Sequence, residues 1–178
     1  MIASAAILGP VTSLPSISAT ESIDEIYKQL WGTSQADNAA VLDMNVVSVY
    51  NLFVGFLRLL DAGNTHAESP GNVQGIQSQF LTISSTSGIQ RRSETGHIYS
   101  SSKAGLVHLT KTLSTEFAPY GIRANCIAPG LFITEMTGGY FSDEAAKVMS
   151  ARGGLPKEVN PATRAGTPKV SHVASQLR

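Results

Sequence analysis

Hydrophobic positions along the chain follow a helical period in three long segments. Apolar residues spaced i, i+3, i+4, i+7 predict an amphipathic helix over residues 21–31. A longer helix is predicted over 37–60, where apolar residues occur almost all the way round. A third runs over 97–119 and ends at Gly121. The all-round apolar pattern indicates that helix 37–60 is covered by a sheet, by neighbouring helices or by a partner subunit.

Short apolar runs separate these helices. Residues 2–8, 79–84 and 122–128 read as buried strands. Polar segments rich in Pro, Ser and Gly, at 9–20 and 61–78, predict loops. Strands that alternate with long helices favour an α/β fold, in which helices pack on a parallel sheet.

The chain changes character beyond Gly130. Large apolar residues over 131–160, with Ser142 as the N-cap of a short helix, predict a loop and helix past the end of a strand. Such a segment is well placed to cover a substrate. It could equally be a small helix packed into the core. Residues 1–178 are interpreted as one domain that includes this segment.

Composition excludes several functions. The 178 residues include 13 basic and 13 acidic side chains, so no net charge attracts nucleic acid. The most apolar stretch, residues 46–60, is too short and too interrupted to span a membrane. No basic residue precedes the apolar N-terminus, so a secretory signal is not expected and a cytoplasmic location is predicted. The lone Cys126 is interpreted as a small buried hydrophobe rather than a reactive thiol.

Tyr99 and Lys103 lie four residues apart at the start of the third helix, on one helical face. An ammonium beside a phenol lowers the phenol's pKa, and such a phenol exchanges protons near neutral pH. His97, two residues earlier, is more simply structural or solvent-facing. The four histidines have no metal-ligand spacing, so no metal site is predicted.

Four segments together resemble the short-chain dehydrogenase/reductase family. Ser85-Thr86-Ser87-Gly88, followed by Tyr99 and Lys103, is similar to the family's Ser-x-x-Gly and Tyr-x-x-x-Lys motifs. The run LDMNVVSVYNL resembles its Asp-x-Asn segment and places an active-site residue at Asn45. IRANCIAPGLFIT and RAGTPK resemble two later segments, with a similarity closest to fungal members. The resemblance covers most of residues 36–168 and implies a partial Rossmann-like, doubly wound parallel sheet with flanking helices.

The resemblance also implies roles for individual residues. Tyr99 would be the general acid/base, Lys103 would tune it, and Ser85 would hold the substrate oxygen. Asn45 would help to hold a water chain that returns protons to Lys103. The cofactor, NAD or NADP, would be bound by Tyr99, Lys103, Pro129, Gly130, Ile133 and Thr134.

The glycine-rich GxxxGxG turn that holds the cofactor's pyrophosphate in this family does not occur in the sequence. The nearest pattern, Gly71 and Gly75, precedes a strand and reads as a flexible loop. IASAAILGP resembles a degraded form of the family's fourth strand. The resemblance therefore implies that the chain begins at about that strand and lacks the residue that selects NAD or NADP.

Three hypotheses follow. The chain is an NAD(P)-dependent oxidoreductase that interconverts an alcohol and a ketone or aldehyde, with apolar residues at 131–149 favouring an apolar or aromatic substrate. Alternatively, it is a catalytically inactive, truncated relative that acts through dimerisation, as a homo- or hetero-oligomer formed by helices 37–60 and 97–119. The third hypothesis is an incomplete or mis-read gene product.

Overall fold

A computed structural model describes the parts of the chain discussed below. The described residues are 1–10, 22–67, 76–91, 95–132, 134, 148–149, 151, 154 and 165–166. The chain divides into two compact units, Met1–Ala128 and Pro129–Arg178. Each unit is described by itself.

The first unit is built on a parallel sheet of three strands in the order β1-β2-β3. Their bounds are Ile2–Ala3 for β1, Gln79–Ile83 for β2 and Arg123–Ile127 for β3. The amino group of Met1 donates to the carbonyl of Gln79 at 2.7 Å, which extends the pairing of β1 with β2 by one residue. The predicted parallel sheet is confirmed. The strand expected over 2–8 is shorter, because a side chain from a helix replaces strand pairing beyond Ala3.

Helices supply most of the remaining structure. They are α1 Ile23–Trp31, α2 Gln35–Leu42, the π-helical turn η1 Asp43–Val47, α3 Ser48–Ala67, the 3-10 turn η2 Thr86–Gly88, α4 His97–Glu116 and the 3-10 turn η3 Ala118–Tyr120. All three predicted helices are confirmed. Gly121 follows η3 with φ 67°, a left-handed conformation that glycine adopts readily, as expected for a terminator.

The second predicted helix is longer than expected. It runs as α2, η1 and α3, and the prediction of a loop over residues 61–67 is wrong. These polar residues form the last turns of α3, where Asn64 accepts from the amide of Ser78 at 2.6 Å and donates to the carbonyl of Tyr120 at 3.0 Å. The stretch Gln35–Thr65, at 31 residues, is long and apolar enough to cross a membrane by length and composition alone. The expectation from residues 46–60, that the apolar stretch is too short to span a membrane, therefore does not hold for the whole helix. The core helix of a soluble protein meets the same criterion.

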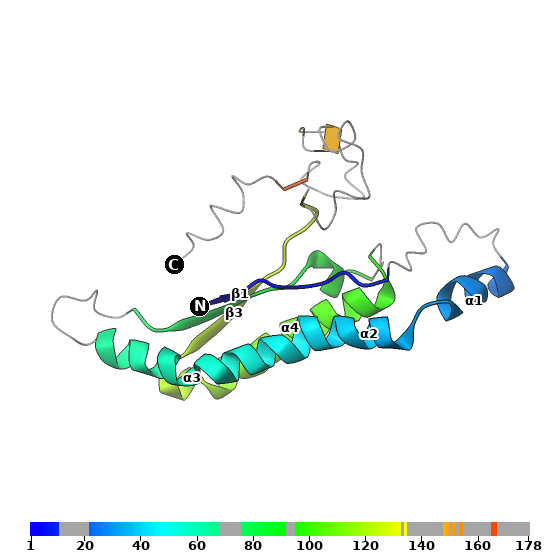
Figure 1. Cartoon of the computed structure of the whole chain (residues 1–178). Helices are drawn as coiled ribbons and strands as arrows, with labels where there is room; N and C mark the ends of the chain where they lie inside the picture. Colours follow the sequence, from blue (N-terminus) through cyan, green and yellow to red (C-terminus); the bar gives the residue numbers. More distant parts are fainter. Residues whose placement is uncertain are drawn as a thin grey trace. The chain divides into compact units, whose positions relative to one another are not determined.

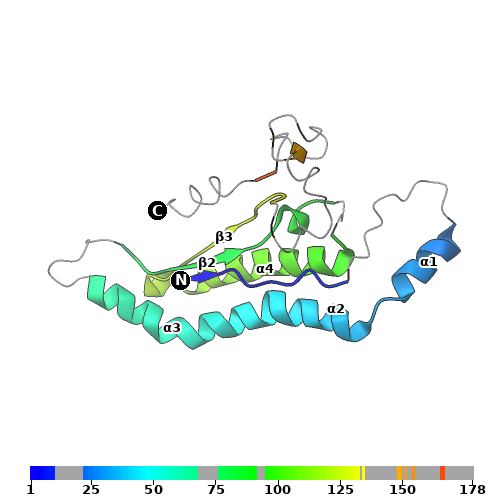
Figure 2. The same cartoon turned by 45° about the horizontal axis from the view of Figure 1, so that its top comes forward.

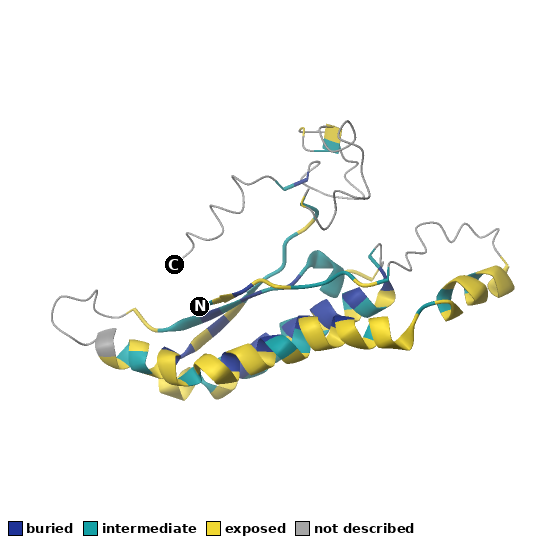
Figure 3. Ribbon diagram, viewed as in Figure 1, coloured by how far each residue is buried: buried dark blue, intermediate teal, exposed yellow. Residues whose placement is uncertain are grey.

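Helices α2, α3 and α4 lie on one face of the sheet, with α3 against β2 and α4 against β3 (Figures 1 and 2). Their sheet-facing sides are buried and their outer sides are exposed (Figure 3). In the described part of this unit, no helix lies on the opposite face of the sheet. The apolar side chain of Ile2 is accordingly 57% exposed.

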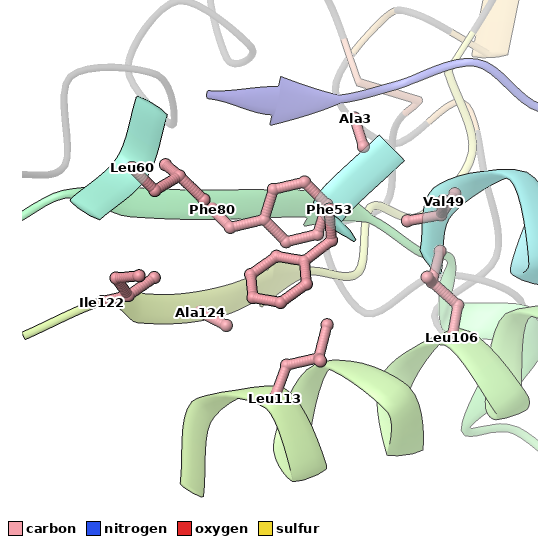
Figure 4. Close-up of a cluster of buried hydrophobic side chains, with 9 residues drawn as sticks. All are labelled: Ala3, Val49, Phe53, Leu60, Phe80, Leu106, Leu113, Ile122 and Ala124. Atoms are coloured by element: carbon pink, nitrogen blue, oxygen red, sulfur yellow. The ribbon is translucent and has the colours of Figure 1, made fainter. Parts of the chain in front are cut away.

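Phe53 of α3 occupies the middle of the core between the sheet and the helices (Figure 4). Its ring centroid lies 5.1 Å from that of Phe80 on β2 and 4.9 Å from that of Phe117 at the end of α4. The buried residues around it are Ala3, Val49, Leu60, Leu106, Leu113, Ile122 and Ala124. This cluster is the apolar layer that holds both crossover helices against the strands.

The outer side of α2–α3 carries an exposed apolar surface. Its members are Leu42, Met44, Val47, Tyr50, Leu52, Val54, Phe56 and Leu59. The helix is therefore apolar almost all the way round, as the pattern predicts, but in the described part of the unit only its inner side is covered. Helix α1 has no buried residue, although Ser22 and Glu25 close a capping box at its start.

The second unit, Pro129–Arg178, is described at only a few positions. Phe132 pairs with Gly166 in a parallel bridge, and the amide of Gly166 donates to the carbonyl of Leu131 at 2.7 Å. A side chain at Gly166 would overlap the Phe132 ring. Ser142 lies outside the described residues. The role of 131–160 in covering a substrate stays a prediction.

Candidate active site

Helix α4 brings Tyr99 and Lys103 together in its first turns. The helix follows Gly96, whose φ of 97° lies in the region that favours glycine. From positions i and i+4, the Lys103 Nζ reaches to 5.6 Å from the centroid of the Tyr99 ring. Both side chains are buried, with Tyr99 8% and Lys103 3% exposed. The predicted pairing of phenol and ammonium is therefore present in the structure.

Ser85 reaches the same place from the end of β2. Its Oγ accepts a hydrogen bond from the amide of Ser87 at 3.1 Å, which caps the turn η2. Its side chain also acts on the Tyr99 phenol, whose pKa it lowers. The serine of the Ser-x-x-Gly motif is thus oriented by its own turn towards the phenol of the Tyr-x-x-x-Lys motif.

Gly88 explains why that motif ends in glycine. The turn η2 packs directly on the backbone of α4, and a Cβ at Gly88 would lie 2.6 Å from the Lys103 carbonyl carbon and 2.7 Å from the Ala104 nitrogen. Real Cβ atoms do not approach backbone so closely. The absence of a side chain at Gly88 therefore sets the distance between Ser85 and the helix that carries Tyr99.

Lys103 is held at both ends by the residues that close β2. Its Nζ donates to the carbonyl of Ile83 at 3.0 Å, and the Ser84 Oγ donates to the Lys103 carbonyl at 2.8 Å. Ser84 is buried and was not among the predicted site residues. The signal available in the sequence is its position, directly before Ser85 and on the same side of the strand as Phe80 and Thr82.

Asn45 is fully buried in the π-helical turn η1 and uses its whole amide. Its Oδ1 accepts from the Ile7 amide at 2.9 Å, and its Nδ2 donates to the Ile7 carbonyl at 3.0 Å and to the Ser102 Oγ at 2.9 Å. The side chain thus pairs with Ile7 as a neighbouring strand would, which is why β1 does not continue. In turn, the Ser102 Oγ donates to the Tyr99 carbonyl at 2.7 Å.

Burial sets the electrostatics of the pair. It raises the pKa of Tyr99, and the hydrogen bond with Ser85 acts in the opposite direction. Burial also lowers the pKa of Lys103, against a smaller charge effect from Cys126 that raises it. The expectation that Lys103 lowers the pKa of Tyr99 overall is therefore not met. Withdrawal of the phenol from water is the larger of the two effects on its pKa, so Tyr99 is a neutral proton donor at neutral pH.

The remaining predicted cofactor residues belong to the second unit. Pro129 is half-buried, Gly130 and Thr134 are exposed, and Ile133 lies outside the described residues. Their part in cofactor binding stays a prediction. The Lys103 ammonium has three N–H donors and gives one to the Ile83 carbonyl. Its other donors suit the hydroxyls of the ribose next to a nicotinamide. The sequence has no glycine-rich turn for the pyrophosphate, so the fit extends to one end of the cofactor only.

Other candidate chemistry is limited in the described part of the chain. It contains no group of three His, Cys, Asp or Glu residues that could hold a metal ion. His97 is exposed at the start of α4. Cys126 is half-buried on β3, rather than fully buried, and its Sγ donates to the Ile127 carbonyl at 3.7 Å.

Comparison with known proteins gives a family for this geometry. The family model of short chain dehydrogenases matches residues 24–145. The short-chain dehydrogenase/reductase VdtF from the fungus Byssochlamys spectabilis is 32% identical over 171 residues, a match that covers 89% of this chain and 53% of VdtF. The chain therefore belongs to the short-chain dehydrogenase/reductase family of oxidoreductases. It spans about half the length of this relative.

Solved structures share the fold. The Pseudomonas aeruginosa RhlG/NADP active-site complex matches with a TM-score of 0.67 at 22% identity, over 98% of this chain and 56% of that one. A short chain dehydrogenase from Leptospira borgpetersenii with bound NAD+ matches with a TM-score of 0.61 at 21% identity, over 97% and 54%. At these identities the likeness shows the fold, a Rossmann-type sheet with flanking helices. The two neighbours were solved with different nicotinamide cofactors.

Proposed function

We propose that the chain carries the acid/base half of an NAD(P)-dependent oxidoreductase that interconverts an alcohol and a ketone or aldehyde. One observation carries the proposal. The Lys103 ammonium lies 5.6 Å from the centroid of the buried Tyr99 ring, and the Ser85 side chain acts on the same phenol and lowers its pKa. A carbonyl oxygen that accepts from the hydroxyls of Ser85 and Tyr99 would be positioned and polarised by them.

The three side chains have separate tasks in this proposal. Tyr99 donates its phenolic proton to the carbonyl oxygen as that oxygen gains negative charge, and takes the proton back in the reverse direction. Ser85 holds the substrate oxygen, since its own oxygen is anchored by the Ser87 amide. Lys103 stabilises the phenolate that remains after the transfer. The raised pKa of Tyr99 keeps the phenol protonated at neutral pH, the form that donates a proton when a carbonyl is reduced.

A nicotinamide cofactor, NAD or NADP, would supply or accept the hydride in this chemistry. Tyr99 and Lys103 would contact its ribose, and Pro129, Gly130, Ile133 and Thr134 would border the nicotinamide. The family's cofactor-bound neighbours support this assignment. The small-molecule substrate would be an apolar or aromatic carbonyl compound or alcohol, and the compartment would be the cytoplasm.

Cofactor titration followed by substitution tests this function. We expect the purified chain to bind NADH or NADPH, and Tyr99→Phe to abolish reduction of ketones while it leaves cofactor affinity largely intact, because the transferable proton is lost but Lys103 remains. Isothermal titration calorimetry and NAD(P)H absorbance measure the two effects. Tyr120→Phe, at a residue that is 64% exposed, is the matched control.

Two outcomes would exclude this role. An absence of binding for either cofactor at millimolar concentration would show that the chain alone is no oxidoreductase. Unchanged turnover in the Tyr99→Phe variant would remove Tyr99 from the reaction.

A second candidate function is that of a dimerising partner without catalysis of its own. The observation that favours it is the exposed apolar surface of α2–α3, where Leu59 is 65% and Phe56 42% exposed. Apolar side chains gathered on one helix face are typical of subunit interfaces. Sedimentation velocity over a concentration series distinguishes the two candidates, since a dimer that binds neither NADH nor NADPH supports the second.

A further inference from the structure

A buried chain of hydrogen bonds runs from the N-terminal segment to the turn of α4 that carries the candidate active site. It begins at the backbone of Ile7, passes through the Asn45 amide and the Ser102 hydroxyl, and ends at the carbonyl of Tyr99. Its three contacts measure 3.0, 2.9 and 2.7 Å. Asn45 and Ser102 are both 0% exposed. Water therefore does not compete for the two bonds that Ser102 makes, and each of them is directional.

The Asn45 amide uses both of its N–H donors in this arrangement. An amide has one acceptor oxygen and two N–H donors, and here Ile7 takes the oxygen and one donor while Ser102 takes the other. None of these three contacts is with Lys103. The side chain of Asn45 consequently acts on the site through Ser102 rather than by touching Lys103 itself.

In this series of hydrogen bonds, Ser102 is the side chain that lies on α4. It stands between Tyr99 and Lys103 on the helix, and its Oγ donates to the carbonyl three residues earlier, at Tyr99. A serine that bonds back to the preceding turn alters the local path of a helix. Ser102 also accepts a hydrogen bond from Asn45, on another helix. Asn45 therefore sets the direction of the bond that Ser102 donates to the Tyr99 carbonyl.

We infer that Ser102 is a positioning residue of the candidate active site, which transmits the placement of Asn45 to the turn that holds Tyr99 and Lys103. The inference rests on the proposed function for its catalytic meaning, but its geometry does not depend on a cofactor. Loss of the Ser102 hydroxyl removes a partner from a buried Asn45 N–H and frees the first turn of α4. The Tyr99 phenol should then sit less firmly in its buried place.

The test follows ionisation of the Tyr99 phenol by ultraviolet absorbance, with the Tyr99→Phe variant subtracted to isolate its signal. The groups next to the phenol are the Ser85 hydroxyl and the Lys103 ammonium, and Cys126 in turn acts on Lys103. In Ser102→Ala we expect the titration midpoint to fall towards that of a free tyrosine, because water reaches the loosened phenol. Ser101→Ala, at the exposed neighbouring serine, should leave the midpoint unchanged.

A double-mutant cycle decides whether Ser102 acts together with Asn45. If it does, Asn45→Ala shifts the midpoint as Ser102→Ala does, and the double variant shifts it no further. Shifts that add would overturn the inference, as would a folded Ser102→Ala protein with the wild-type midpoint. A Ser102→Ala chain that has lost its circular dichroism signal would show a general structural role instead, and would equally contradict it. The titration needs no turnover, so these outcomes stay separate from a failure to bind NADH or NADPH.

Discussion

The two halves of helix α4 pack against the same sheet by different means. Residues 97–103 are joined to β2 and η1 by hydrogen bonds, among them those of Ser102 and Lys103. Residues 104–116 bury Leu106 and Leu113 against the aromatic cluster around Phe53. One polar contact lies within this second half, where the hydroxyls of Thr82 and Thr110 are 2.8 Å apart; Figure 4 shows the apolar residues around it.

The two kinds of contact have different effects: apolar burial stabilises the fold, and hydrogen bonds fix the positions of the side chains. Apolar burial is non-directional, so the second half of α4 gains free energy from area without fixing any one atom closely. Hydrogen bonds hold donor and acceptor to a narrow range of distances and angles. The half of the helix that needs an accurate geometry is therefore the half that is held by polar contacts, and substitutions in the two halves should fail in different ways.

The largest effect is expected in the apolar half. Phe53→Ala removes the ring that contacts both Phe80 and Phe117, and should lower the free energy of unfolding by about 3–5 kcal/mol. Phe56→Ala, on the exposed side of the same helix, should cost less than about 1 kcal/mol. Urea denaturation followed by circular dichroism measures both. Similar losses in the two variants would show that the cluster around Phe53 is not the main apolar core.

A smaller effect is expected where the polar half meets η2. Gly88→Ala forces the turn away from the backbone at Lys103 and should cost about 1–3 kcal/mol, because backbone on both sides must shift. The phenol of Tyr99 should also titrate differently, since Ser85 moves with the turn. Gly55→Ala is the matched control, because its new Cβ meets nothing within 4 Å. On α3 this change should instead stabilise by about 0.5–1 kcal/mol. Equal signs for the two variants would contradict the close approach at Gly88.

The smallest expected change in stability concerns the buried charge. Lys103→Met removes an ammonium whose burial lowers its pKa, and should raise the free energy of unfolding at neutral pH by about 1 kcal/mol while it abolishes any activity. Lys111→Met, at an exposed position of α4, should leave stability unchanged. Denaturation at neutral pH measures both, and a destabilised Lys103→Met protein would show that the ammonium contributes more through its hydrogen bond than its burial costs.

The pH dependence of the same variant follows from the two shifts. The pKa of Tyr99 is raised, so its contribution to stability is present below its unfolded value near 10.0 and is lost as the pH rises through the folded value. The pKa of Lys103 is lowered, so its contribution is lost as the pH falls through the folded value and is regained towards 10.5. In the wild-type chain the two partly cancel. Lys103→Met should therefore lack the rise in stability that wild type shows as the pH approaches 10.5, and parallel curves below pH 10.5 would contradict the shift assigned to Lys103.

Periodicity was enough to locate the helices α1 and α4 and the strands β2 and β3 to within a few residues. It failed at Asn64, where a polar residue was interpreted as loop although it lies within α3 and its side chain binds the backbone of Ser78 and Tyr120. It also failed at Ile7, where an apolar residue was interpreted as strand although its backbone pairs with a side chain. Both errors have one cause, which is that the partner lies far away in the sequence.

The sequence by itself determined the family, the order of the elements, and the four residues Asn45, Ser85, Tyr99 and Lys103 as the candidate site. The family and the residues Asn45 and Ser85 follow from the resemblance of local motifs, whereas the pairing of Tyr99 and Lys103 follows from a spacing of four residues on a helix. Tertiary structure alone decided that Ser84 and Ser102 hold this site, and that the pKa of Tyr99 is raised rather than lowered. Burial and buried hydrogen bonds arise only when distant segments pack, so no local pattern specifies them.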